Sequence, residues 1–253
     1  RAYEEQMAWV EAQGGRIILM ASRALCAAAQ SPDDYLMVYE RLLTQARQPV
    51  IVHWLGSMFD PALAGYWGYS QIDEALKAVT ALLRAHATRI DGIKISLLDK
   101  TKEIALRREL PASVRMYTGD DFDFAELIGG DALGYSDALL GIFDAIAPAA
   151  SAALSELASG RRDRFDEILA PCVPLSRHIF SAPTQFYKTG IVFMAWLNGY
   201  QKEFVMLGGQ ETKRSLPHLA EIFRLAVRAQ LLQDPELAVT RMDTLCRAEG
   251  ITV

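Results

Sequence analysis

The residue best suited to covalent chemistry in this sequence is Lys94, which lies between Ile93 and Ile95 in the apolar run 90–96. Side chains alternate along a strand, so the two isoleucines point to one face and Lys94 to the other. If that other face is the interior of a barrel, loss of hydration lowers the pKa of the amine, and a neutral amine attacks carbonyl carbons. The alternative is a lysine near a strand end whose ammonium group reaches solvent.

Polar or aromatic side chains also occur at the ends of two other apolar runs, 49–54 and 114–118, and one lies within the weaker run 130–136. An imidazole can transfer protons near pH 7, and carboxylates accept hydrogen bonds from substrate hydroxyls. Each group also has a structural alternative: a hydrogen-bonded histidine at a strand end, or an aspartate that caps the helix expected near 124–128. The candidates are His53 and Trp54, then Gly119, Asp120 and Asp121, and lastly Ser136.

The remaining histidines and glycine pairs do not form a recognisable site. His86 and His218 lie on polar helix surfaces, and His178 is expected to be structural. The sequence has no His-x-His, His-Glu-x-x-His or Cys-x-x-Cys motif, and Gly208-Gly209 lacks the third glycine of a dinucleotide fingerprint. We therefore expect neither a metal ion nor another cofactor.

These residues need a scaffold of parallel strands, and the alternation of short apolar runs with amphipathic helices predicts one. Ser31-Pro32 and Ser70 are expected to begin the helices that follow the first and second strands, and a short charged helix is expected over 100–110. The predicted strands cover 16–20, 49–54, 90–96, 114–118 and a weak fifth run within 130–136.

After Pro148 the pattern is entirely helical, with helices expected over 149–158, 162–169, 185–197, 217–231 and 235–249. We therefore expect residues 1–148 to form part of a (β/α)₈ barrel, and residues 149–253 to form its closing helix and a helical extension of the same domain.

Composition excludes several classes of protein. The chain has 253 residues, is 51% hydrophobic and carries a net charge of −5. It has no Lys/Arg run for nucleic-acid binding and no apolar window long enough for a membrane span. Three scattered cysteines argue against a disulfide framework and favour a cytoplasmic location.

Four segments in order give a resemblance to a known family. Asp91-Gly92-Ile93-Lys94 resembles the Schiff-base strand of the dihydrodipicolinate synthase and N-acetylneuraminate lyase family. The strand at 49–54, the strand end at 118–121 and the C-terminal helices from 147 onward are similar to other parts of that family, in the same order. More narrowly, the chain resembles a branch described as a domain of unknown function.

The resemblance implies roles for individual residues. Lys94 would form the Schiff base, and His53 would stand where the family has a proton-relaying tyrosine, with Trp54 or Tyr117 altering the pocket. Gly119, Asp120 and Asp121 match the strand end that binds substrate hydroxyls in the lyases. Ser136 would contact substrate from the last strand.

We therefore expect an aldol-type lyase or synthase that acts on a 2-oxo acid or related carbonyl compound, as a homo-oligomer. Two alternatives stay open: a Schiff-base barrel that hydrates or dehydrates its substrate, and a non-catalytic barrel that serves as a ligand sensor or assembly partner.

Five strands are fewer than the eight of a closed barrel, so the first strand read here would be the fourth of the ring. At about 30 residues per βα unit, we expect roughly 90–130 residues to precede Arg1 in the native polypeptide, with a hydroxyl pair that binds the substrate carboxylate.

Overall fold

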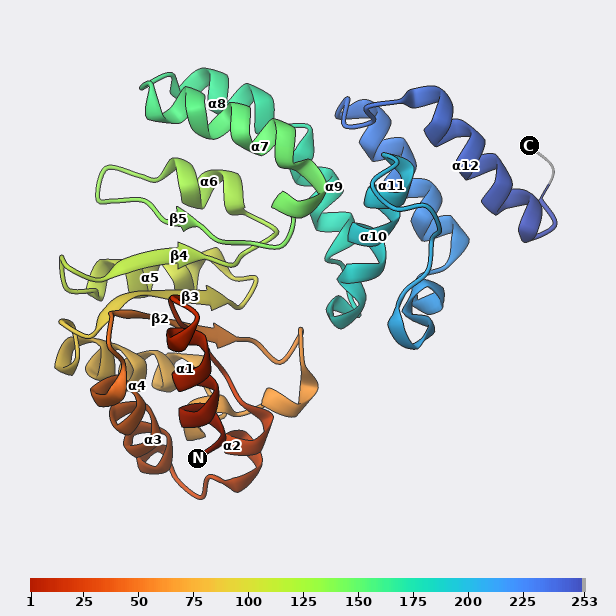
Figure 1. The fold of residues 1–253 in the computed structure, drawn as a ribbon. Coiled ribbons are helices and arrows are strands. Elements are labelled where there is room, and N and C mark those ends of the chain that lie inside the picture. The colour runs from red at the N-terminus through yellow and green to blue at the C-terminus, as the bar shows by residue number, and fades with distance from the viewer. Residues whose placement is uncertain (252–253) are drawn as a thin grey trace. The chain divides into compact units, whose positions relative to one another are not determined.

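The computed structural model describes residues 1–251 and divides them between two compact units. The first unit spans Arg1–Leu139 and contains the sheet, whereas the second begins at Leu140 and is helical. Figure 1 shows the course of the chain through both.

The first unit alternates strands with helices. The five strands are β1 Ile18–Met20, β2 Val50–Leu55, β3 Ile90–Ser96, β4 Arg115–Thr118 and β5 Asp137–Ala138. The α-helices are α1 Ala2–Ala12, α2 Arg23–Ala28, α3 Pro32–Gln45, α4 Ile72–Ala85, α5 Lys100–Glu109 and α6 Phe124–Gly129. Two 3₁₀ helices, η1 Pro61–Leu63 and η2 Tyr66–Gly68, lie in the loop after β2.

All five strands are parallel and follow one another in chain order, β1-β2-β3-β4-β5. This confirms the predicted α/β class with a parallel sheet. Their register places one row of residues side by side across the sheet, and side chains in such a row point to the same face. The row runs Met20, His53, Lys94, Tyr117 and Asp137.

The fifth strand does not lie where the sequence pattern predicted it. Residues 130–136 form a tight turn instead, in which Asp131 pairs with Gly134 and the Asp131 carboxylate accepts a hydrogen bond from the Leu133 amide. Gly130 ends α6 with a positive φ of 74°, a conformation that glycine adopts without strain. Pairing with β4 therefore begins only at Asp137.

Helix α3 begins as its sequence predicted, because Ser31 is the N-cap, Pro32 occupies the first turn and the Asp34 carboxylate accepts from the Ser31 amide at 3.1 Å. Helix α4 begins one residue later than expected, with Gln71 rather than Ser70 as its N-cap.

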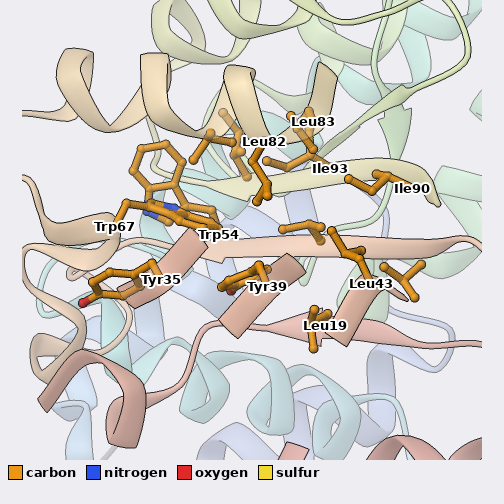
Figure 2. Packing of buried hydrophobic residues seen from close by; sticks show 14 of the residues in the cluster. Leu19, Tyr35, Tyr39, Leu43, Trp54, Trp67, Leu82, Leu83, Ile90 and Ile93 are labelled. Carbon is orange, nitrogen blue, oxygen red and sulfur yellow. The ribbon is translucent and has the colours of Figure 1, made fainter. Parts of the chain in front are cut away.

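A hydrophobic core fills the space between one face of the sheet and helices α3 and α4 (Figure 2). Strands contribute buried side chains at alternating positions, and the helices contribute theirs at the three-to-four-residue spacing of one helical face. This core orients the sheet, since a slip of one residue would move every apolar side chain to the wrong face. Its members include Leu19, Val52, Trp54, Ile93, Ile95, Tyr39, Leu43, Val79, Leu83 and Trp67.

The second unit has no strand among its described residues, 140–251. Helix α8 agrees with the predicted bounds, α7 begins earlier than predicted, and α9 was not delimited from the sequence. Its helices are α7 Phe143–Ala158, α8 Arg162–Leu169, α9 Cys172–Ile179, η3 Thr184–Phe186, α10 Tyr187–Leu197, η4 Leu207–Lys213, α11 Leu216–Arg228 and α12 Pro235–Ala248. Within residues 1–251, every helix is too short or too polar to cross a bilayer.

Candidate active site

Lys94 lies in the middle of the sheet, on the face opposite the hydrophobic core. Its neighbours Ile93 and Ile95 are buried in that core, so alternation sends the lysine the other way, where it is half-buried. It is in register with His53 on β2 and with Tyr117 on β4. The predicted orientation of Lys94 relative to its two isoleucines therefore agrees with the structure.

The aliphatic stem of Lys94 passes directly over Gly119, the residue after β4. A Cβ atom at position 119 would lie 2.8 Å from Lys94 Cε and 2.7 Å from the Ile95 carbonyl oxygen, and it would overlap Ser96 Oγ. The Gly119 amide donates to that same Ile95 oxygen at 2.8 Å, which holds the backbone in this position. Glycine is required here because of close approach, since its φ is not in the left-handed region.

His53 is buried beside Lys94 and shares a hydrogen bond of 3.1 Å between its Nε2 and Ser96 Oγ. Burial and, to a smaller extent, the positive charge of Lys94 together lower the pKa of His53 to about 3. The imidazole is therefore neutral throughout the physiological range. The expectation that this imidazole can transfer protons near pH 7 is corrected in this respect, because burial keeps the ring neutral and hydrogen-bonded to Ser96.

Ser96 is a site residue that the sequence reasoning missed. It is buried, follows Lys94 by two positions and so shares its face of β3, and its Oγ contacts both His53 and the Gly119 position. The period of two in a strand was the available signal. A hydroxyl can donate and accept at once, so Ser96 can connect the imidazole to a group bound at Lys94.

The Tyr117 hydroxyl donates to Asp91 Oδ2 at 2.6 Å. Burial and the hydrogen bond to Asp91 together raise the pKa of Tyr117 to about 12. Asp91 also accepts from Arg115 at 2.8 Å and from Arg16 at 3.2 Å, so the phenol belongs to an ionic network near the start of the strands. Arg115 lies over the Tyr117 ring at 5.1 Å as well.

Asp120 has the structural role of a capping aspartate, which was the alternative to a substrate ligand. It is 1% exposed, and its Oδ1 accepts from the amides of Phe122 at 2.8 Å and Asp123 at 2.9 Å. Burial raises the pKa of Asp120, and Oδ2 has no hydrogen-bond partner among the described residues. The carboxylate thus caps the turn before α6, and one of its oxygens is unavailable to a substrate hydroxyl. Asp121 is buried as well.

Two other predicted site residues lie apart from Lys94. Trp54 points into the hydrophobic core, where its ring meets that of Trp67 edge-on at 6.3 Å (Figure 2). Its register partner is Ile95, not Lys94, because adjacent strand residues point to opposite faces. Ser136 is fully buried, and its hydroxyl accepts from Arg107 Nη1 at 3.3 Å. Neither is positioned to contact a ligand at Lys94.

The other histidines do not join the site. His178 and His218 stack at 4.1 Å within the helical unit, where burial lowers the pKa of His218 to about 4. No group of three or more His, Cys, Asp or Glu side chains within the described part of the chain is arranged to hold a metal ion.

The arrangement is a lysine amine, a neutral imidazole and a bridging hydroxyl on one face of a parallel sheet. No curated protein matches the chain. A family model described as "Protein of unknown function (DUF993)" matches residues 1–251, which is nearly the entire sequence. The chain therefore belongs to the DUF993 family.

Proposed function

We propose that this protein is a Schiff-base-forming enzyme, an aldol-type lyase or synthase that acts on a 2-oxo acid or a related carbonyl substrate, with Lys94 as the nucleophile. The observation that supports it best is the position of Lys94 opposite the core, with Ser96 and His53 beside it. An amine flanked by groups that can relay a proton but carry no charge suits attack on a carbonyl.

The scaffold is proposed to be part of a (β/α)₈ barrel of the dihydrodipicolinate synthase type. Five parallel strands in chain order, each joined to the next by a helical connection, support this architecture. Barrel enzymes collect their catalytic groups at the C-terminal ends of strands, and Ser96 and Gly119 stand at those ends of β3 and β4.

In the proposed reaction, the Lys94 amine adds to the carbonyl carbon, and the resulting carbinolamine loses water to give an iminium ion. A base then removes the proton of the hydroxyl group on the β-carbon, and the bond between the α- and β-carbons breaks. Its electron pair forms the carbon–carbon double bond of the enamine as the π electrons of the iminium return to nitrogen, and the β-carbon leaves as a carbonyl fragment. A proton added to the enamine carbon regenerates an iminium ion, and water hydrolyses it to free the second product and Lys94. Synthesis follows the same steps in reverse.

His53 and Ser96 are proposed to move the protons. Because the imidazole is neutral, it accepts or supplies a proton only in concert with the Ser96 hydroxyl at its Nε2. Ser96 Oγ and Lys94 Cε both lie against Gly119, so a proton on Ser96 can reach an atom bonded to the Lys94 nitrogen.

Reduction with sodium borohydride tests the proposal. The purified protein is incubated with pyruvate and a panel of other 2-oxo acids and aldehydes, reduced, and analysed by peptide mass spectrometry. We expect a stable secondary amine on the peptide that contains Lys94. Saturable binding of a carbonyl compound with no reducible adduct would instead support a non-catalytic ligand sensor.

A further inference from the structure

Glu103 is a buried carboxylate on helix α5, behind the end of strand β4. It is 1% exposed, and Leu106 is the only other buried residue of this highly charged helix. Loss of hydration at such a position costs free energy for a carboxylate, whereas it is favourable for a leucine. Its location therefore calls for a specific contact.

That contact is with Thr118, the last residue of β4. Thr118 Oγ1 donates to Glu103 Oε2 at 3.0 Å and accepts from the Asp120 amide at 3.1 Å. Two hydrogen bonds in series thus connect the helix to the turn that follows the strand. The residue between Thr118 and Asp120 is Gly119, on which Lys94 rests.

We infer that Glu103 is a positioning residue for Lys94, which acts through Thr118 on the Gly119–Asp120 turn. The inference deepens the proposed function and rests on it. Lys94 Cε would be 2.8 Å from a Cβ at position 119, so a small displacement of that backbone displaces the amine. A misplacement of about 1 Å at a reacting atom typically costs about 100-fold in rate.

The surroundings make the Glu103 contact sensitive to protonation. Burial raises the pKa of Glu103 to about 7, against the opposing effect of hydrogen bonds from Ser136 and Thr118. The charged groups that act on it are Asp120, which favours the protonated form, and Arg107, which favours the ionised form. An ionised carboxylate holds the Thr118 hydroxyl more strongly than a protonated one does.

Substitutions at Thr118 and Glu103 test the inference. Thr118→Val removes the hydroxyl at constant shape, and Thr118→Ser retains it. With any carbonyl compound that the wild type traps, we expect the valine variant to form the adduct about tenfold more slowly and the serine variant to stay within about twofold. Glu103→Leu should lower the rate like the valine variant without a loss of stability at pH 8, which a merely structural role does not predict. Glu109→Gln, at the exposed end of α5, is the matched control.

Amide hydrogen exchange of the peptide that contains Gly119 and Asp120 gives a second readout that needs no substrate. We expect at least about tenfold faster exchange at Asp120 in both variants. Thr118→Val removes the acceptor of the Asp120 amide, and Glu103→Leu removes the carboxylate that fixes that acceptor in place. Unchanged exchange and unchanged trapping in both variants would overturn the inference. Failure of the wild type to trap any carbonyl would overturn the proposed function instead, while exchange would still report on the turn.

Discussion

Lys94 and Gly119 fit together across two neighbouring strands so closely that position 119 has no room for a side chain. The nearest obstacle that cannot move is the Ile95 carbonyl oxygen, 2.7 Å from the site of an added Cβ. The end of the Lys94 stem therefore packs against the backbone of position 119.

Gly119→Ala should therefore displace Lys94 or the backbone around it, because the added methyl group has no room. We expect a loss of about 1–3 kcal/mol in the free energy of unfolding and a fall of roughly 100-fold in the rate of adduct formation. Denaturant unfolding and timed borohydride trapping measure the two effects. Gly92→Ala is the control, because its added Cβ would meet Arg115 and Tyr117 rather than Lys94. Wild-type trapping by Gly119→Ala would show that this packing does not determine the position of the amine.

Lys94→Arg should abolish the reducible adduct and leave the fold intact, since arginine keeps its charge near neutral pH and is not a nucleophile there. Mass spectrometry after reduction and a thermal unfolding curve measure these outcomes. Lys188→Arg, at an exposed position on α10, should trap as the wild type does. An adduct on the Lys94→Arg protein would identify a different lysine as the nucleophile.

Ser96→Ala should separate adduct formation from proton transfer. The substitution removes the hydroxyl that bonds His53 Nε2 at 3.1 Å but leaves Lys94 untouched. We expect trapping to change by only a few fold, while exchange of the substrate's α-protons with deuterated solvent slows by roughly 100-fold. Proton NMR of a 2-oxo acid in D₂O follows that exchange. Equal exchange rates in the two proteins would exclude Ser96 from the relay.

Glu103 should make stability depend on pH in a defined direction. Its pKa rises from 4.5 to about 7 on folding, so the unfolded chain releases this proton first and the free energy of unfolding falls as pH increases from about 4.5 to about 7. At 1.36 kcal/mol per pKa unit, the loss from this group is about 3 kcal/mol.

The comparison of wild type with Glu103→Gln isolates that effect. The variant cannot ionise at this position, so its stability relative to the wild type should improve by about 3 kcal/mol between pH 4.5 and pH 8. Urea unfolding at a series of pH values measures the difference. A constant difference across this range would mean that Glu103 titrates at its ordinary pKa.

Arg214 should stabilise the helical unit, because its buried guanidinium connects several backbone carbonyls. Its guanidinium donates to four backbone carbonyls, one in the last residue of α9 and three in the segment that follows, and only an arginine can reach so many acceptors with one planar group. Arg214→Met should cost about 2–4 kcal/mol in unfolding free energy because these carbonyls lose their donor. Chemical unfolding measures the loss, and the exposed Arg228→Met serves as control. The acceptors are Ile179 at 3.4 Å, Ser181 at 2.7 Å, Ala182 at 3.3 Å and Pro183 at 3.1 Å.

Local pattern was sufficient to predict the parallel sheet and the orientation of Lys94. Ile93 and Ile95 must be buried together, and strand geometry then sends Lys94 to the other face whatever the rest of the chain does. The same reasoning predicted β3 to the residue and the start of α3, where Ser31 and Pro32 fix the first turn. The strand predicted within 130–136 was wrong, because these residues form a turn that the Asp131 carboxylate stabilises.

Tertiary structure alone decided which polar residues meet. Trp54 and His53 are adjacent in sequence, yet one packs in the core and the other lies beside Lys94. Asp120 looked like a ligand for substrate, but the amides of the following turn occupy its Oδ1. The link from Glu103 to Thr118 joins residues fifteen positions apart, and the pKa of His53 depends on burial by the whole sheet. Sequence periodicity specifies the face on which a side chain lies, whereas its partners and its hydration depend on how distant elements pack.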